Sequence, residues 1–234
     1  MVALAADNAS VLSPDQEAYG KTYSEWAASW LQWVSSISAD ANPLNDSTGG
    51  FAAYGQSGPV WFLVGLTGNG GTATRTAKIP TGKALFSPVV NYFWVNLPEL
   101  GDNPWSTTQE TFVRGSIAGV MDTATGLSCQ IDGHTVAKLS SHRVQTGSQA
   151  FMVNLPFNDI WGWVASAGAH TGLKGPCLDD GFYLLVPPLS PGQHTIHFAG
   201  TLTATGFHLD VTYHLEVASP RHGAGASETS GKDN

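Results

Sequence analysis

The sequence predicts an all-β protein, a single β-sandwich of jelly-roll or immunoglobulin-like type with an N-terminal amphipathic helix packed on it. Its 27 Gly and 13 Pro interrupt short apolar runs, and only 12% of its residues are charged, which is typical of a turn-rich β fold. Apolar and polar residues alternate from Phe207 to Leu215, and again from His194 to Phe198. Because a strand with one buried and one solvated face has this period of two, the two runs indicate a hairpin.

The N-terminal part of the chain predicts the helix. Ser13 to Gln16 and Thr22 to Glu25 each match a capping box, and Gly20 between them indicates a break or a kink. Large apolar side chains then recur at spacings of three and four, so they share one helix face. We expect this face to pack on the sandwich, although a stacking platform for sugars would use the same residues. They are Tyr19, Tyr23, Trp26, Trp30, Trp33 and Ile37.

Apolar runs between turn-forming residues predict the remaining strands. The segment from Asn158 to Asp180 is predicted to be a long loop. Because long loops inside a domain usually carry function, this segment is the first place to search for a ligand. The expected strands are residues 60–66, 84–95, 111–120, 127–131, 149–155 and 182–186.

The 234 residues are expected to form one domain, residues 13–218. Residues 1–12 resemble the end of a signal peptide and are interpreted as a leader remnant, and residues 219–234 as a flexible tail. We therefore expect a secreted protein, extracellular or periplasmic. No apolar run is long enough to span a bilayer. The net charge of −8, with 10 scattered Lys and Arg, argues against a nucleic-acid partner. The oligomeric state stays open.

The chain contains 2 cysteines, Cys129 and Cys177. One disulfide between them would suit an exported protein, and we expect that bond. Two buried thiols are the alternative.

Three segments resemble a family of uncharacterised secreted bacterial proteins: the Trp-rich helix, the run GQSGPVWFL at residues 55–63, and Arg75 followed by Pro80 to Phe86. The likeness is close from Tyr19 to Asn91 and loose at the Pro191-Gly192 turn. It implies export and a compact β fold, and it assigns no catalytic residue. Many members carry cysteines near the positions of Ala52 and Ala77, so the resemblance implies that packing replaces a bridge there.

Aromatic side chains are the strongest indication of function. The chain has 8 Trp, and Trp105, Trp161 and Trp163 stand among Gly, Pro and Asn residues that favour exposure. Exposed rings stack on the apolar faces of sugars. We therefore expect these rings, with His170 of the same long segment, to bind an extracellular glycan or similar polymer.

Two other classes of function stay open. A secreted hydrolase would use the carboxylates of Asp159, Asp179 or Asp180, since glycosidases need a pair of them. No cofactor is expected, but a divalent metal ion is an alternative. A structural protein whose exposed strands assemble with copies of itself is the third interpretation. The weak candidate ligands for a metal, which share one strand face, are His208, Asp210 and His214.

Overall fold

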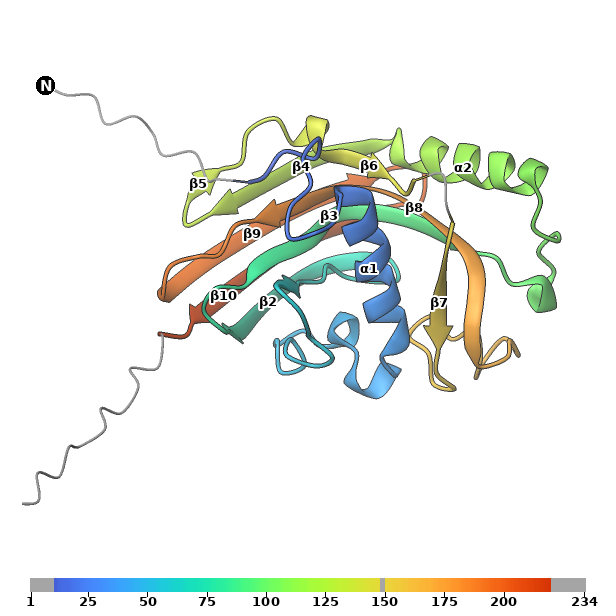
Figure 1. Ribbon diagram of the computed structural model, residues 1–234, viewed down its shortest axis with the longest axis horizontal. Coiled ribbons are helices and arrows are strands. Elements are labelled where there is room, and N and C mark those ends of the chain that lie inside the picture. The colour runs from blue at the N-terminus through green and yellow to red at the C-terminus, as the bar shows by residue number, and fades with distance from the viewer. Residues whose placement is uncertain (1–10, 148–149, 220–234) are drawn as a thin grey trace, which may run out of the picture.

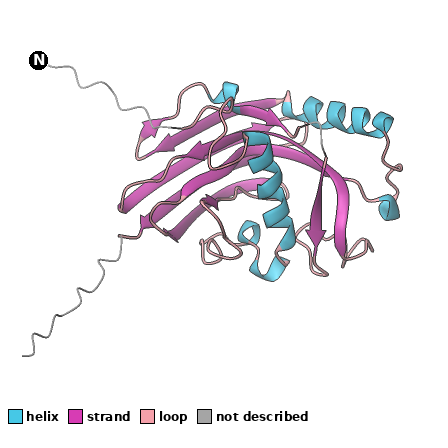
Figure 2. Ribbon diagram, in the orientation of Figure 1, coloured by secondary structure: helices cyan, strands magenta, loops and turns pink. Residues whose placement is uncertain are grey.

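The computed structural model describes residues 11–147 and 150–219, which form two β-sheets and two α-helices (Figures 1 and 2). No helix in these ranges combines the length and the hydrophobicity that crossing a bilayer requires. The helices are α1 (Tyr23–Ser36) and α2 (Thr107–Met121), with short 3₁₀ turns η1 (Ala39–Ala41), η2 (Pro43–Asn45), η3 (Pro98–Leu100) and η4 (Leu139–His142). The strands are β1 (Val60–Phe62), β2 (Gly70–Ile79), β3 (Ala84–Val95), β4 (Ala124–Ile131), β5 (His134–Thr135), β6 (Arg143–Gln145), β7 (Phe151–Leu155), β8 (Gly172–Val186), β9 (Gly192–Leu202) and β10 (Phe207–Val217).

The strands form a central sheet and an outer sheet. The central sheet has the order β1-β3-β8-β6, with β7 also paired to β8, and the outer sheet has the order β2-β10-β9-β4-β5. β1 pairs with β3, and β2 with β10, in parallel. The prediction of a mainly β protein is therefore confirmed, whereas the prediction of an all-β protein is wrong. The jelly-roll or immunoglobulin-like assignment stays a prediction.

The middle of the central sheet is buried on both faces, which explains why β1, the first part of β3 and residues 182–186 of β8 are almost continuously apolar. On one face Leu85 and Leu184 join the core that lies between the two sheets. On the other face Phe86 and Tyr183 stack with ring centroids 5.3 Å apart, in the core beneath α1. Figure 1 shows α1 crossing this face. The expected packing of the N-terminal helix on a sheet is thus confirmed.

The outer sheet keeps one polar, solvated face. In β10 the inward residues Leu209, Val211 and Tyr213 are buried, and His208 and Asp210 between them are exposed. β9 pairs with β10 antiparallel, so the predicted hairpin is confirmed.

The sequence located the start of α1 correctly at its second capping box. Thr22 Oγ1 accepts a hydrogen bond from the Glu25 backbone N–H, and the Glu25 carboxylate accepts one from the Thr22 backbone N–H. The earlier box at Ser13 forms only a turn, in which the Gln16 N–H donates to Ser13 O over 3.2 Å.

The strand predicted at residues 111–120 is wrong, because these residues belong to α2. Ser106 caps the helix by accepting from the Gln109 backbone at 3.2 Å. Val113, Ile117 and Met121 recur every four residues and are buried. This stripe packs on the central sheet beside the outer sheet, and that contact stabilises a sequence with weak helix propensity.

The predicted loop 158–180 is also partly wrong, because β8 begins at Gly172. The connection between β7 and β8 is therefore shorter than expected. At the other end of the domain, the Leu12 N–H donates to Leu185 O over 2.9 Å, which ties the chain to the central sheet. Residues 1–10 and 220–234, which hold most of the expected leader remnant and tail, lie outside the described residues.

The predicted disulfide is wrong, because Cys129 and Cys177 are both free and buried. Cys129 lies in the core between the sheets and Cys177 in the core beneath α1, so the central sheet separates the sulfurs. Burial raises the pKa of each thiol to about 12. Both therefore stay protonated and act as small apolar side chains.

Candidate functional site

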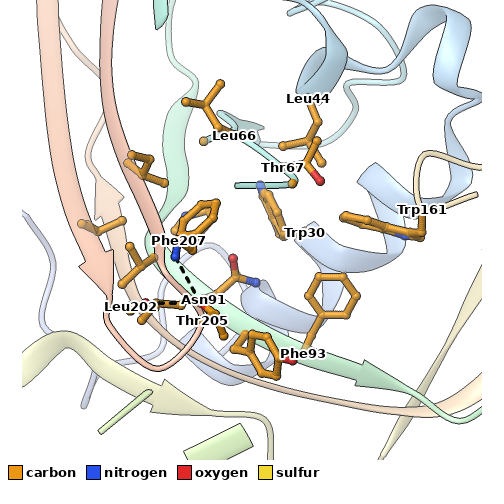
Figure 3. A pocket seen from close by; sticks show the side chains of 17 residues that line it. Trp30, Leu44, Leu66, Thr67, Asn91, Phe93, Trp161, Leu202, Thr205 and Phe207 are labelled. Carbon is orange, nitrogen blue, oxygen red and sulfur yellow. Dashed lines mark hydrogen bonds between the residues drawn. The ribbon is translucent and has the colours of Figure 1, made fainter. Parts of the chain in front are cut away.

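A pocket of about 240 Å³ opens where α1, one edge of β3 and the turn between β9 and β10 meet (Figure 3). We call it the edge pocket. Seventeen residues line it: Trp30, Leu44, Gly65, Leu66, Thr67, Gly68, Pro88, Val89, Val90, Asn91, Tyr92, Phe93, Trp161, Leu202, Thr205, Phe207 and Leu209.

The pocket exists because β3 loses its neighbour on one side. β1 pairs with β3 only as far as Phe86, and the chain then crosses to β2 in the outer sheet. Beyond that point β8 is the only described strand paired with β3. Pro88 stands on the free edge, where its missing N–H breaks no ladder hydrogen bond.

A register shift between Pro88 and Val90 decides which side chains reach the pocket. Val89 is the extra residue, so both Val89 and Val90 join the core between the sheets. Every later side chain of β3 is turned to the other face. Asn91 and Phe93 consequently face α1, instead of the outer sheet.

The aromatic walls are held by hydrogen bonds and ring contacts. Trp30 is 3% exposed, and its Nε1–H donates to Leu63 O over 2.8 Å. Trp161 donates from Nε1 to Ser35 Oγ at 3.3 Å, and its ring lies 4.8 Å from that of Phe93. Figure 3 shows these rings and Phe207 around the Asn91 amide. The walls are therefore fixed before any ligand arrives.

The loop that closes the pocket is anchored by a buried arginine. Arg75 Nη1 donates to Val64 O over 2.8 Å and to Gly65 O over 2.9 Å. A Cβ at Gly65 would lie 2.9 Å from Leu209 Cδ2, so a side chain there would require Leu209 to shift. Arg75, which the family resemblance singled out, thus shapes the pocket from behind.

Among the residues that line the edge pocket, none carries a charge. The Thr205 hydroxyl is occupied, since it donates to Leu202 O over 3.2 Å and accepts from the Phe207 backbone over 3.3 Å. Asn91 Nδ2 donates to Asp179 Oδ2 over 3.0 Å. Asn91 Oδ1 accepts no hydrogen bond from the described part of the chain and is a free acceptor.

Asp179, one of the predicted catalytic residues, lies behind the pocket wall and is fully buried. Its carboxylate accepts hydrogen bonds from Asn91 Nδ2 and the Tyr183 hydroxyl. Burial raises the pKa of Asp179 to about 7; the hydrogen bonds from Tyr183 and Asn91 lower it, and the charge of Asp180 raises it. Asp179 reaches the pocket only through Asn91.

The other two predicted carboxylates have structural partners. Asp180 pairs with Arg143, at 3.0 Å to Nε and 2.9 Å to Nη2. Asp159 is buried and holds the turn after it through the backbone N–H groups of Trp161, Trp163 and Val164, at 3.0, 3.2 and 2.7 Å. Neither lines the edge pocket.

Of the predicted ligand-binding residues, Trp161 alone lines the edge pocket. Trp163 packs on Trp161, with ring centroids 5.8 Å apart, and Trp105 packs on the buried face of α2. His170 is exposed, and its backbone lies 3.5 Å from Glu99 Oε1. Asn91, Phe93 and Phe207 were not predicted as site residues from the sequence, and Trp30 was expected in the core, with a stacking platform as the alternative.

The predicted metal ligands His208, Asp210 and His214 lie on the solvated face of the outer sheet. Asp210 Oδ1 lies 3.0 Å from Nε2 of His197 on the neighbouring strand. Within residues 11–147 and 150–219, no three His, Cys, Asp or Glu side chains are grouped so that they could hold a metal ion.

A Ser-His-Asp cluster lies at the end of β9. His194 Nδ1 is 2.7 Å from Asp132 Oδ2, and His194 Nε2 is 3.5 Å from Ser190 Oγ but only 2.8 Å from Ser190 O. Both ring nitrogens face acceptors, an arrangement that favours the charged imidazolium and raises the pKa of His194. A nitrogen that already carries a proton cannot take one from the serine hydroxyl, so the cluster links two turns and does not activate a nucleophile.

Comparison of the chain with protein-family models, with curated proteins and with solved structures gave no match.

Proposed function

We propose that the protein binds a neutral ligand by taking one of its rings into the edge pocket. The ligand class that we favour is a neutral extracellular glycan, with the sugar ring at a chain end as the inserted group. The observation that supports this proposal is an uncharged pocket with fixed aromatic walls and a free acceptor, Asn91 Oδ1.

The chemistry of the walls favours a sugar ring. Aromatic side chains contact the C–H faces of a sugar, and an amide oxygen accepts from a hydroxyl. A charged ligand would leave its charge unpaired among apolar groups, which is costly. The volume of about 240 Å³ is below the usual range for sites that hold a whole drug-sized molecule, so it suits a single ring.

Binding is favoured over hydrolysis because of where the carboxylates lie. A glycosidase needs two carboxyl groups that face the bond to be broken. None of Asp159, Asp179 and Asp180 lines the edge pocket. The expected export of the protein remains part of this proposal, since it would expose the pocket to extracellular polymers.

The test is a titration of ¹⁵N-labelled protein with neutral methyl glycosides and with phenol, followed by NMR. We expect shifts at the Asn91 side-chain amide and at the indoles of Trp30 and Trp161. Trp161→Ala should weaken binding at least about tenfold, or ~1.4 kcal/mol. Trp105→Ala, which removes a tryptophan outside the pocket, should leave affinity unchanged.

Each other outcome excludes part of the proposal. Binding of phenol without any glycoside would support a ring pocket and reject a glycan ligand. Shifts confined to another surface, or equal losses of affinity in both variants, would reject the edge pocket as the site.

A further inference from the structure

Asn91 connects the edge pocket to a buried carboxylate. Its amide lies in the pocket wall, and Nδ2 donates to Asp179 Oδ2 over 3.0 Å. We propose that Asp179 sets whether Asn91 offers the ligand in the pocket a hydrogen-bond acceptor or a donor. This inference rests on the proposed function and adds a regulation of the same site.

The switch follows from hydrogen-bond chemistry. An ionised carboxylate only accepts, so Asn91 must turn Nδ2 toward Asp179 and leave Oδ1 to the pocket. The Tyr183 hydroxyl already donates to Asp179 Oδ1. A proton on Asp179 therefore resides on Oδ2 and needs an acceptor, which Asn91 supplies by turning Oδ1 inward.

This turn needs little space, since the two ends of an amide have nearly the same shape. After it, Nδ2 faces the pocket. The ionised state thus favours ligands that donate through a hydroxyl, and the protonated state favours ligands that accept through a carbonyl or an ether oxygen.

The phenols and the thiol near Asp179 keep their protons while Asp179 titrates. Burial raises the pKa values of Tyr183 and Tyr23 above their usual value, so both phenols stay neutral. Burial likewise raises the pKa of Cys177 to about 12. The remaining charged groups around Asp179 lie on β8 itself, on β6 and on α2. Asp180 of β8 pairs with Arg143 of β6, and Arg114 of α2 donates to the carbonyl of Thr146, whose N–H donates to Asp179 O.

The test compares two probes of similar size, phenol as a donor and acetophenone as an acceptor. Phenol stays neutral between about pH 5.5 and about pH 8.5, and Asp179 titrates between these limits. We expect phenol to bind about three- to tenfold more tightly at the higher pH and acetophenone to show the opposite preference. The same samples give the ¹H and ¹⁵N shifts of the Asn91 side-chain amide in the free protein, which should titrate with Asp179.

Asp179→Asn removes the ionisable group and should abolish the pH dependence of both affinities. Glu216→Gln, which neutralises a partly exposed carboxylate that pairs with Lys78 on the outer sheet, should leave the pH dependence unchanged. If Asp179→Asn does not fold, the Asn91 amide shifts of the wild-type protein still decide: their constancy across the pH range overturns the inference. Binding of both probes with a constant affinity ratio also overturns it, and leaves the proposed function intact. Absence of binding by both probes at both pH values overturns this inference, whereas the titration with methyl glycosides decides the proposed function separately.

Discussion

The substitution Trp30→Ala measures how much a buried tryptophan on the aromatic face of α1 contributes to the free energy of unfolding. The side chain is 3% exposed, and its indole N–H donates to Leu63 O. Trp30→Ala removes the ring contacts and this hydrogen bond, a loss that typically costs about 3–5 kcal/mol. Because Trp30 also lines the edge pocket, water can enter the space that the ring vacates and solvate Leu63 O. We therefore expect the lower end of that range, about 3 kcal/mol.

Urea denaturation followed by circular dichroism measures the free energy of unfolding, and an unchanged slope shows that the two states remain comparable. Trp30→Phe keeps most of the apolar contact and should cost about 1–2 kcal/mol, mainly through the lost hydrogen bond. The control is Phe112→Ala on α2, where the ring is 59% exposed and the expected loss is below about 1 kcal/mol. A loss at Trp30→Ala no larger than that of the control would refute the packing argument and favour a stacking platform.

Two further predictions concern the cysteines and His194. Cys129 and Cys177 should resist a thiol reagent in the native protein and both react once the unreduced protein is unfolded; an unreactive unfolded chain would reveal a disulfide. Burial lowers the pKa of His194, but the hydrogen bond and charge of Asp132 and the carbonyl of Ser190 outweigh it, so the pKa is raised above 6.5. The contribution of protonated His194 to the free energy of unfolding is therefore complete below the pKa of histidine in the unfolded chain. It is lost as the pH rises through the pKa of His194 in the folded protein. His194→Gln should remove this loss from the stability-versus-pH curve, and an identical curve for the variant would contradict the assignment.

Helices and strands with one solvated face could be predicted, because their apolar and polar residues recur with the period of the helix or the strand. In β10 apolar and polar residues alternate, since every second side chain faces water. The capping box of Thr22 and Glu25 marks the N-terminus of α1 in the sequence. α2 was missed for the opposite reason. Its Gly115 and Gly119 lower helix propensity, and the contact of Val113 and Ile117 with the central sheet decides the structure.

The disulfide prediction failed because spacing along the chain does not reveal which face of a sheet a residue occupies. Cys129 points inward from the outer sheet, toward the central sheet. Cys177 points from the central sheet toward α1, on its far side. Export to an oxidising compartment would permit a disulfide, but it does not bring together two side chains on opposite sides of a sheet.

The edge pocket depends on a feature that no periodicity in β3 encodes. With regular alternation, Leu85, Val89, Asn91 and Phe93 would all face the outer sheet. The single extra residue at Val89 reverses this order, so that Asn91 meets Asp179 and Phe93 meets Trp161 on the α1 side. A bulge is favourable here because the free edge of β3 has no second partner strand whose register it would disturb. The same departure of β1 that leaves this edge free also opens the pocket beside it, which is why the site lies where the strand pattern is least regular.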